Sequence, residues 1–180
     1  WLRDKIKFIK KASDTEKIIK SLKSNNGIYL VPAFTGLGAP HWAANARGVL
    51  TGLTRDTGPK EIVRATVESV AYQTLDLFDA MNNDGLRPKI VKVDGGMVKN
   101  NWFSQFLADV VDVKVLRPKV EETTALGAAF MAGLQIGVYK SLKDISKNWQ
   151  VDRTFHPKMK SSNRKNLIKG WNKAIRKTLS

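Results

Sequence analysis

Apolar residues along the chain recur with two different spacings, and each spacing predicts one type of element. Short runs rich in β-branched and aromatic side chains predict strands. Recurrence every three or four residues predicts helices with one buried face. The strands are expected at 28–31, 48–53, 89–93 and 113–116. The helices are expected at 14–22, 59–82, 101–111, 124–133, 141–147 and 161–179.

Local signals indicate where several of these helices begin and end. The stretch SDTE at 13–16 has the pattern of a capping box, in which the Ser13 hydroxyl and the Glu16 carboxylate each accept the other residue's amide. Gly27 follows two asparagines and is suited to a left-handed C-cap. Pro59 suits the first position of the next helix, because an N–H there would have no helical partner.

The long helix that begins at Pro59 carries an apolar stripe at helical spacing. Its members are Val63, Val67, Val70, Thr74, Leu77 and Met81. This spacing predicts that the stripe faces the core. Glu68 and Asp76 lie in the same helix, and we interpret both as solvated or structural rather than catalytic. In the helix at 161–179 the expected buried stripe is Leu167, Trp171, Ala174 and Ile175.

The order of the elements predicts the fold class. Two strands come early, and strands then alternate with helices, which indicates an α/β domain with helices packed on a mixed sheet. The helix at 124–133 is rich in small residues and includes Gly127 and Gly133. Glycine inside a helix costs up to about 1 kcal/mol relative to alanine. We therefore expect another backbone to pack closely against this helix.

Composition excludes several classes of protein. The chain has 180 residues and is 42% hydrophobic, which suits one domain with its own core. It has no cysteine and only two histidines, which excludes disulfides, thiolate metal sites and a His-rich metal site. No apolar run approaches the roughly 20 residues of a membrane span. No secretory signal is recognised, so a cytoplasmic location is expected.

The net charge is +15, and basic residues dominate the C-terminal end. No acid follows Asp152, although many lysines and arginines do. A basic face of this kind can bind nucleic acid or anionic lipid. Most of the basic residues are lysines, however, whereas arginine forks are typical of side chains that read phosphates and bases. We therefore favour a solvated helix, with neither nucleic acid nor membrane as a partner.

Two adjacent glycines separate a predicted strand from a predicted helix in the stretch VDGGMVKNN, residues 93–101. Such a turn exposes backbone amides next to a helix N-terminus, which suits a phosphate or a ribose edge. Gly95 and Gly96 lie beyond the C-terminal end of the strand, where α/β layers bind ligands. Asn100 could cap the helix or offer its amide to a base. Alternatively, the glycines only make a tight turn and Asn100 is only a cap.

Four longer stretches carry a resemblance to a known family. They are VPAFTGLGAPHWAANARG at 31–48, ESVAYQTLDLFDAM at 68–81, VDGGMVKNNWFSQFLAD at 93–109 and RPKVEETTALGAAFMAGLQIGV at 117–138. In order and spacing they resemble the glycerol kinase group of the FGGY carbohydrate kinases over nearly the whole chain. The resemblance implies an actin/Hsp70-like, ribonuclease H-like ATPase fold. It also implies that residues 1–180 form a C-terminal nucleotide-binding domain.

The resemblance assigns roles within the glycine turn. Gly96 matches the backbone position that contacts phosphate and ribose of ADP or ATP, and Gly95 matches the other glycine of the adenosine motif. Asn100 matches the polar residue near the adenine. No catalytic residue and no metal ligand can be assigned to this chain, because the family's general base and polyol-binding residues lie upstream. The chain alone is expected to be inactive.

The implied reaction is ATP-dependent phosphorylation of glycerol to sn-glycerol 3-phosphate, with Mg²⁺ bridging phosphate oxygens. The chain begins with Trp1 rather than Met, and we expect an N-terminal domain of the same polypeptide and a homo-oligomeric state. A competing hypothesis is a xylulose or gluconate kinase, although the sequence FTGLGAPHW favours glycerol. Two non-kinase hypotheses are a basic nucleic-acid-binding module and an actin- or Hsp70-like assembly module, which would not need that loop.

Overall fold

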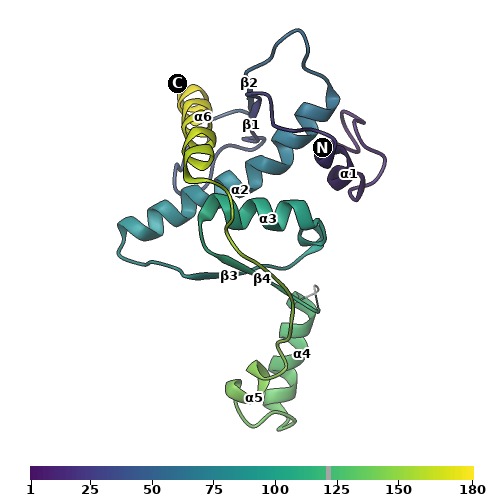
Figure 1. Ribbon diagram of the computed structural model, residues 1–180. Coiled ribbons are helices and arrows are strands. Elements are labelled where there is room, and N and C mark those ends of the chain that lie inside the picture. The colour runs from purple at the N-terminus through teal and green to yellow at the C-terminus, as the bar shows by residue number, and fades with distance from the viewer. Residues whose placement is uncertain (121–122) are drawn as a thin grey trace.

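The computed structural model describes residues 1–120 and 123–180, in which helices pack around two small sheets (Figure 1). The helices are α1 (Asp14–Lys20), α2 (Pro59–Asn83), α3 (Asn101–Val111), α4 (Thr123–Gln135), α5 (Leu142–Ser146) and α6 (Ser161–Leu179), with a 3₁₀ helix η1 (Gly96–Lys99) before α3. The strands are β1 (Tyr29–Val31), β2 (Val49–Thr51), β3 (Ile90–Lys92), β4 (Lys114–Pro118) and β5 (Val151–Phe155). In these described residues, no helix is both long enough and apolar enough to cross a membrane.

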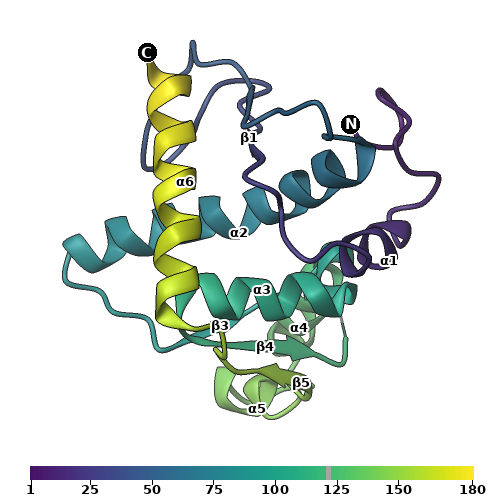
Figure 2. The same ribbon diagram turned by 45° about the horizontal axis from the view of Figure 1, so that its top comes forward.

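The larger sheet is mixed, as predicted. β3 pairs in parallel with β4, where Val91 lies opposite Val115, and β4 pairs antiparallel with β5. β4 is therefore the central strand, and Val115 is fully buried. α3 lies along one side of this sheet, whereas α4 and α5 lie on the other side (Figures 1 and 2). β1 and β2 form a separate antiparallel pair, with Leu30 opposite Leu50.

The sequence does not predict β5. The stretch VDRTF contains three consecutive polar residues, and only Phe155 of this strand is buried. An edge strand needs only one neighbour and one apolar contact, so the sequence carries a weak signal for it. Its position matters because β5 brings Asp152 next to β4.

The stripe predicted for α2 is correct at Val63 and Val67 and wrong at Val70, Leu77 and Met81. Val63 and Val67 are buried. Val70, Leu77 and Met81 are 36%, 42% and 37% exposed. The buried residues of α2 are Val63, Arg64, Ala65, Val67, Glu68, Ser69, Ala71, Tyr72 and Leu75. The buried face of the helix is set by where its neighbours approach, which its own periodicity does not show.

Those neighbours meet at Tyr72, the centre of the main core. Its ring stacks on Trp171 of α6 at a centroid distance of 5.2 Å and meets Phe106 of α3 edge-on at 5.6 Å. Tyr29 of β1 lies on a further side at 5.9 Å. Aromatic pairs of this kind contribute about 0.5–1.5 kcal/mol beyond the area they bury. The stripe predicted for α6 is confirmed: Trp171, Ala174 and Ile175 are buried and Leu167 is partly buried.

The close backbone approach predicted for α4 is not found. Among the described residues, nothing lies within 4 Å of the position that a Cβ would take at Gly127. At Gly133 the nearest atoms, 2.8 Å away, belong to the Tyr139 ring rather than to another backbone. Gly133 is also the only described residue of α4 that is buried. The matching stretch 117–138 includes residues 121 and 122, which lie outside the described residues.

Two helical glycines should respond oppositely to alanine. A Cβ on Gly170 of α6 would overlap the Tyr29 ring, whereas Gly127 of α4 faces open space. We expect Gly170→Ala to lower the free energy of unfolding by about 1–3 kcal/mol, because the ring must move against its neighbours. Gly127→Ala is expected to raise it by up to about 1 kcal/mol through helix propensity. Urea unfolding measures both, and equal stabilisation by the two substitutions would contradict this packing of α6 on β1.

Candidate functional site

The glycine turn follows the C-terminal end of β3 and leads through η1 into α3. Gly95 has a φ of +85°, a conformation that glycine adopts without strain. Gly96 lies outside that region of φ, and no described residue lies within 4 Å of a Cβ built on either glycine. The turn therefore explains glycine at position 95. Neither conformation nor packing among the described residues requires it at position 96.

Asn100 caps α3, which confirms one of its two predicted roles. Its Oδ1 accepts the N–H of Phe103 at 2.9 Å, and its own backbone is extended, as an N-cap requires. Its Nδ2 donates to Oγ1 of Thr15 at 3.2 Å. The two bonds hold the amide from both sides, so its orientation beside the glycine turn is determined.

The capping box predicted at 13–16 does not form. Ser13 has a helical backbone, and its side chain makes no capping hydrogen bond. Oε2 of Glu16 instead accepts the N–H of Asn101 at 3.3 Å, and Oε1 pairs with Lys20 at 2.5 Å. Together with Thr15, Glu16 attaches α1 to the N-terminus of α3, which lies 85 residues further along the chain.

Arg117 of β4 supports the turn from the other side, a role that no sequence pattern indicates. Its Nη1 donates to the carbonyl of Val98 in η1 at 2.9 Å and to Oδ1 of Asn101 at 3.1 Å. Its Nε donates to Asp152 of β5 at 2.8 Å. These partners come from three separate segments, so no local spacing could have identified the arginine.

Two acidic side chains near the turn, Asp94 and Glu16, accept hydrogen bonds from other residues of the chain. Asp94, directly before the glycines, accepts a hydrogen bond from the Thr123 hydroxyl at the start of α4. Burial opposes ionisation of Glu16, but hydrogen bonds from Lys20 and from the Asn101 backbone outweigh it and lower the pKa of this carboxyl. Among the described residues, no group of three or more His, Asp or Glu side chains could hold a metal ion.

The sequence predicted that Glu68 is either solvated or structural. The structure shows that it is structural. It is 1% exposed and accepts hydrogen bonds from Arg64 Nε at 2.7 Å, Asn25 Nδ2 at 3.0 Å and the Tyr72 hydroxyl at 3.2 Å. Burial raises the pKa of Glu68, while the Arg64 guanidinium and the other donors oppose this shift.

Asp76 is also structural and joins three segments. Its carboxylate accepts the Trp171 Nε1–H of α6 at 3.0 Å and lies 3.1 Å from Nε2 of His41. Burial raises the pKa of Asp76, and the contacts with His41 and Trp171 oppose this shift. The loop that contains FTGLGAPHW is thereby attached to α2 and α6.

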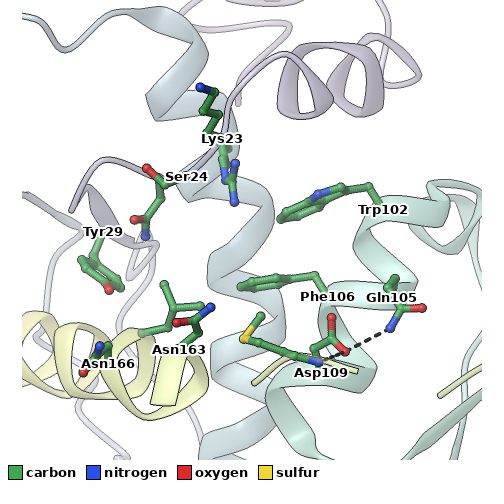
Figure 3. A pocket seen from close by; sticks show the side chains of 13 residues that line it. Lys23, Ser24, Tyr29, Trp102, Gln105, Phe106, Asp109, Asn163 and Asn166 are labelled. Atoms are coloured by element: carbon green, nitrogen blue, oxygen red, sulfur yellow. Dashed lines mark hydrogen bonds between the residues drawn. The ribbon is translucent and has the colours of Figure 1, made fainter. Parts of the chain in front are cut away.

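A cavity of about 520 Å³ lies beside α3 (Figure 3). Its walls come from α2, α3, α6, β1 and the segments between α1 and β1 and between β5 and α6. They include Trp102, Phe106 and Asp109. Gly95, Gly96 and Asn100 do not line it. The structure therefore brings the three sequence-predicted residues together at the turn, but it does not bring them to this cavity.

Solved structures with the same fold define the class of protein. Plasmodium falciparum glycerol kinase with ADP matches with a TM-score of 0.87 and 37% identity, over 100% of this chain and 36% of that one. Gluconate kinase from Lactobacillus acidophilus matches with a TM-score of 0.77 and 24% identity, over 98% of this chain and 36% of that one. The chain therefore has the sugar-kinase form of the actin/Hsp70-like ATPase fold, as expected.

The model of the FGGY family of carbohydrate kinases, C-terminal domain, matches residues 1–136, and the chain belongs to this family. Glycerol kinase 1 of Pseudomonas aeruginosa is 53% identical over 180 residues, which are 100% of this chain and 36% of that protein. Glycerol kinase of Clostridium botulinum strain 657 is 50% identical over 99% of this chain and 36% of its own length. The chain thus spans about a third of the length of the curated relatives it matches.

Replacing Glu16 should weaken the attachment of α1 to α3 in a pH-dependent way. The pKa of Glu16 is lowered from its ordinary value of 4.5, so its ionised form stabilises the fold above that pH. We expect Glu16→Gln to lower the free energy of unfolding at neutral pH. The difference from the unsubstituted chain should shrink as the pH falls below 4.5 and through the lowered pKa.

Urea unfolding at several pH values measures this effect. Asp56→Asn is the matched control, because the exposed Asp56 carboxylate makes no hydrogen bond with the described residues. It should change stability by less than about 0.5 kcal/mol. A Glu16→Gln effect that stays constant across the pH range would show that the carboxylate charge does not contribute.

Proposed function

We propose that this chain is the nucleotide-binding C-terminal part of an ATP-dependent glycerol kinase, which converts glycerol and ATP to sn-glycerol 3-phosphate and ADP. The observation that carries the proposal is a difference in similarity between substrate classes. Among solved structures, a glycerol kinase shares 37% identity with this chain, whereas xylulose and gluconate kinases share 20–24%. The same difference favours glycerol over a larger sugar as the substrate.

The glycine turn is the part of the chain that we assign to the nucleotide. The backbone at Gly95 and Gly96 is open, and the turn leads into the positive end of a helix, which favours anionic groups. In this assignment phosphate and ribose lie along Gly96, and the adenine lies near Asn100. The bond from Asn100 to Thr15 keeps the amide in place before the nucleotide arrives.

The residues present fit ATP better than they fit a metal ion. Open backbone at the turn suits the nucleotide, whereas the described residues offer no set of metal ligands. When bound, ATP would supply the phosphoryl group, and Mg²⁺ would neutralise charge on its phosphates. This chain would bind and orient the nucleotide. The general base and the polyol-binding residues are assigned to an N-terminal domain of the same polypeptide.

The proposal also covers the domain role of this chain, its partner, its location and its oligomeric state. Residues 1–180 would act as the C-terminal nucleotide-binding domain, and their main partner would be the N-terminal domain. A homo-oligomeric state belongs to the proposal because the resemblance to glycerol kinases implies it. The cytoplasmic location expected from the sequence completes the proposal. Light scattering of the longer polypeptide measures the oligomeric state directly.

A substrate panel tests the proposed activity. ATP-dependent phosphorylation is measured for a longer polypeptide that carries this chain, with glycerol, dihydroxyacetone, xylulose and gluconate, and for the 180-residue chain alone. We expect a clear preference for glycerol and no turnover by the chain alone. Preference for xylulose or gluconate would contradict the substrate, and turnover by the chain alone would contradict the assignment of the base to another domain.

Gly96→Ala tests the nucleotide assignment itself. The described chain leaves room for a Cβ there, so the free energy of unfolding should stay within about 0.5 kcal/mol of the original value. A methyl group at the nucleotide should nevertheless raise the KM for ATP by about tenfold or more. Gly127→Ala, which also faces open space, is the control and should leave this KM unchanged. An unchanged KM in Gly96→Ala would remove the turn from the nucleotide site.

A further inference from the structure

The cavity beside α3 contains two buried side chains of opposite charge that the proposed kinase function does not use. Arg64 of α2 is 9% exposed and Asp109 of α3 is 8% exposed, and both line the same cavity. Its volume of about 520 Å³ lies within the range of small-molecule sites. Charged side chains are rarely this buried unless they are paired, so the partners of both need to be accounted for.

Two hydrogen bonds and one ring contact fix the guanidinium of Arg64, and one of its nitrogens has no hydrogen-bond partner among the described residues. Its Nε donates to Glu68 at 2.7 Å, and its Nη1 donates to the carbonyl of Leu22 at 2.8 Å. The ring of Trp102 lies against the guanidinium at 5.1 Å. Within the described residues, Nη2 makes no hydrogen bond. Glu68 balances the charge of Arg64, but it does not occupy this last donor.

Asp109, like Arg64, has one polar atom without a hydrogen-bond partner among the described residues, and in Asp109 this atom is an acceptor. Its Oδ1 accepts the N–H groups of Lys158 at 2.7 Å and Met159 at 3.2 Å. It also accepts a hydrogen bond from Nε2 of Gln105 at 3.0 Å (Figure 3). Its Oδ2 has no hydrogen-bond partner in the described part of the chain. No fully buried side-chain polar atom of the described residues lacks a partner. Oδ2 of Asp109 and Nη2 of Arg64 are therefore not fully buried. Both residues line the cavity, so we take the cavity as the space that these two atoms reach.

The rest of the lining adds one more charge and an apolar surface. Lys23 is exposed, lies at the opposite end of the cavity from Asp109 in Figure 3, and forms no ion pair with a described residue. Phe106 and Met159 contribute apolar surface. Because Glu68 compensates Arg64, the uncompensated charges of the cavity are the Lys23 ammonium and the Asp109 carboxylate.

We propose that this cavity binds a small zwitterion of the amino acid class with an apolar side chain, either a free amino acid or a short peptide. The ligand carboxylate accepts a hydrogen bond from Arg64, and its ammonium group donates to Oδ2 of Asp109. The carboxylate of a peptide, which lies further from the ammonium group than that of a free amino acid, also reaches Lys23. The apolar side chain packs against Phe106 and Met159. A purely anionic ligand would leave Oδ2 of Asp109 without a donor, and a purely cationic ligand would face Arg64 and Lys23.

Isothermal titration calorimetry of the 180-residue chain tests the proposal, with leucine and the dipeptide leucyl-leucine as probes. Leucinamide lacks the carboxylate and N-acetyl-leucine lacks the ammonium group. We expect one site per chain for a zwitterionic probe. The matching blocked analogue should bind at least about tenfold more weakly, because it leaves either the free nitrogen of Arg64 or Oδ2 of Asp109 without a hydrogen-bond partner. The tighter of the two probes distinguishes an amino acid from a peptide.

Two outcomes of this titration would overturn the proposal. Equal affinity for leucine and its blocked analogues would show that the two charged groups of the ligand are not recognised. No binding of either zwitterion up to about 10 mM, the range of very weak complexes, would show that the cavity is not a site for this class.

Substitutions of residues that line the cavity test whether the probe binds there. Asp109→Asn keeps the Oδ1 acceptor and the volume of the side chain, and it should weaken binding of the preferred probe by about tenfold. Lys23→Ala removes an exposed side chain and should weaken binding of leucyl-leucine by about threefold. Lys173→Ala, an exposed lysine of α6 outside the cavity, is the matched control and should leave affinity unchanged.

Circular dichroism and thermal unfolding show whether each variant folds. If Asp109→Asn does not fold, Lys23→Ala and the blocked analogues decide the question, since Lys23 is exposed. Unchanged affinity in every folded cavity variant would place the bound probe elsewhere on the protein and overturn the proposal.

Discussion

Glu68 of α2 has a buried carboxylate, which accepts hydrogen bonds from Arg64, Asn25 and Tyr72. Three parts of the structure depend on this group. Asn25 positions the segment that enters β1, Tyr72 carries the ring that α3 and α6 pack against, and Arg64 reaches the cavity. Removing one partner of such a buried ion pair costs about 3–5 kcal/mol, because the other charge is left uncompensated.

α3 connects the two candidate sites. Its N-terminus, capped by Asn100, adjoins the glycine turn, and Asp109 near its other end lines the cavity. The helix is held by α1 through Glu16 and by β4 through Arg117. The proposed nucleotide-binding function uses the turn. It does not use the cavity, where Arg64 and Asp109 each keep a polar atom without a hydrogen-bond partner among the described residues.

Signals that act within a few residues predicted the structure well. Pro59 begins α2, and Asn100 accepts the N–H three residues on, as an N-cap does. Gly95 has the positive φ that a tight turn requires. The capping-box pattern at 13–16 failed because Glu16 found a partner in α3 that competes with its own helix terminus. A local pattern gives no information about a partner far along the chain.

The sequence alone determined the α/β class, the positions of most elements, the turn at Gly95 and Gly96, and the family resemblance, because each rests on short-range chemistry or on ordered motifs. Only the tertiary structure decided which face of α2 is buried, that Arg117 supports the turn, and that Arg64 and Asp109 share a cavity. The physical reason is that burial and charge compensation depend on groups that folding brings together from distant parts of the chain.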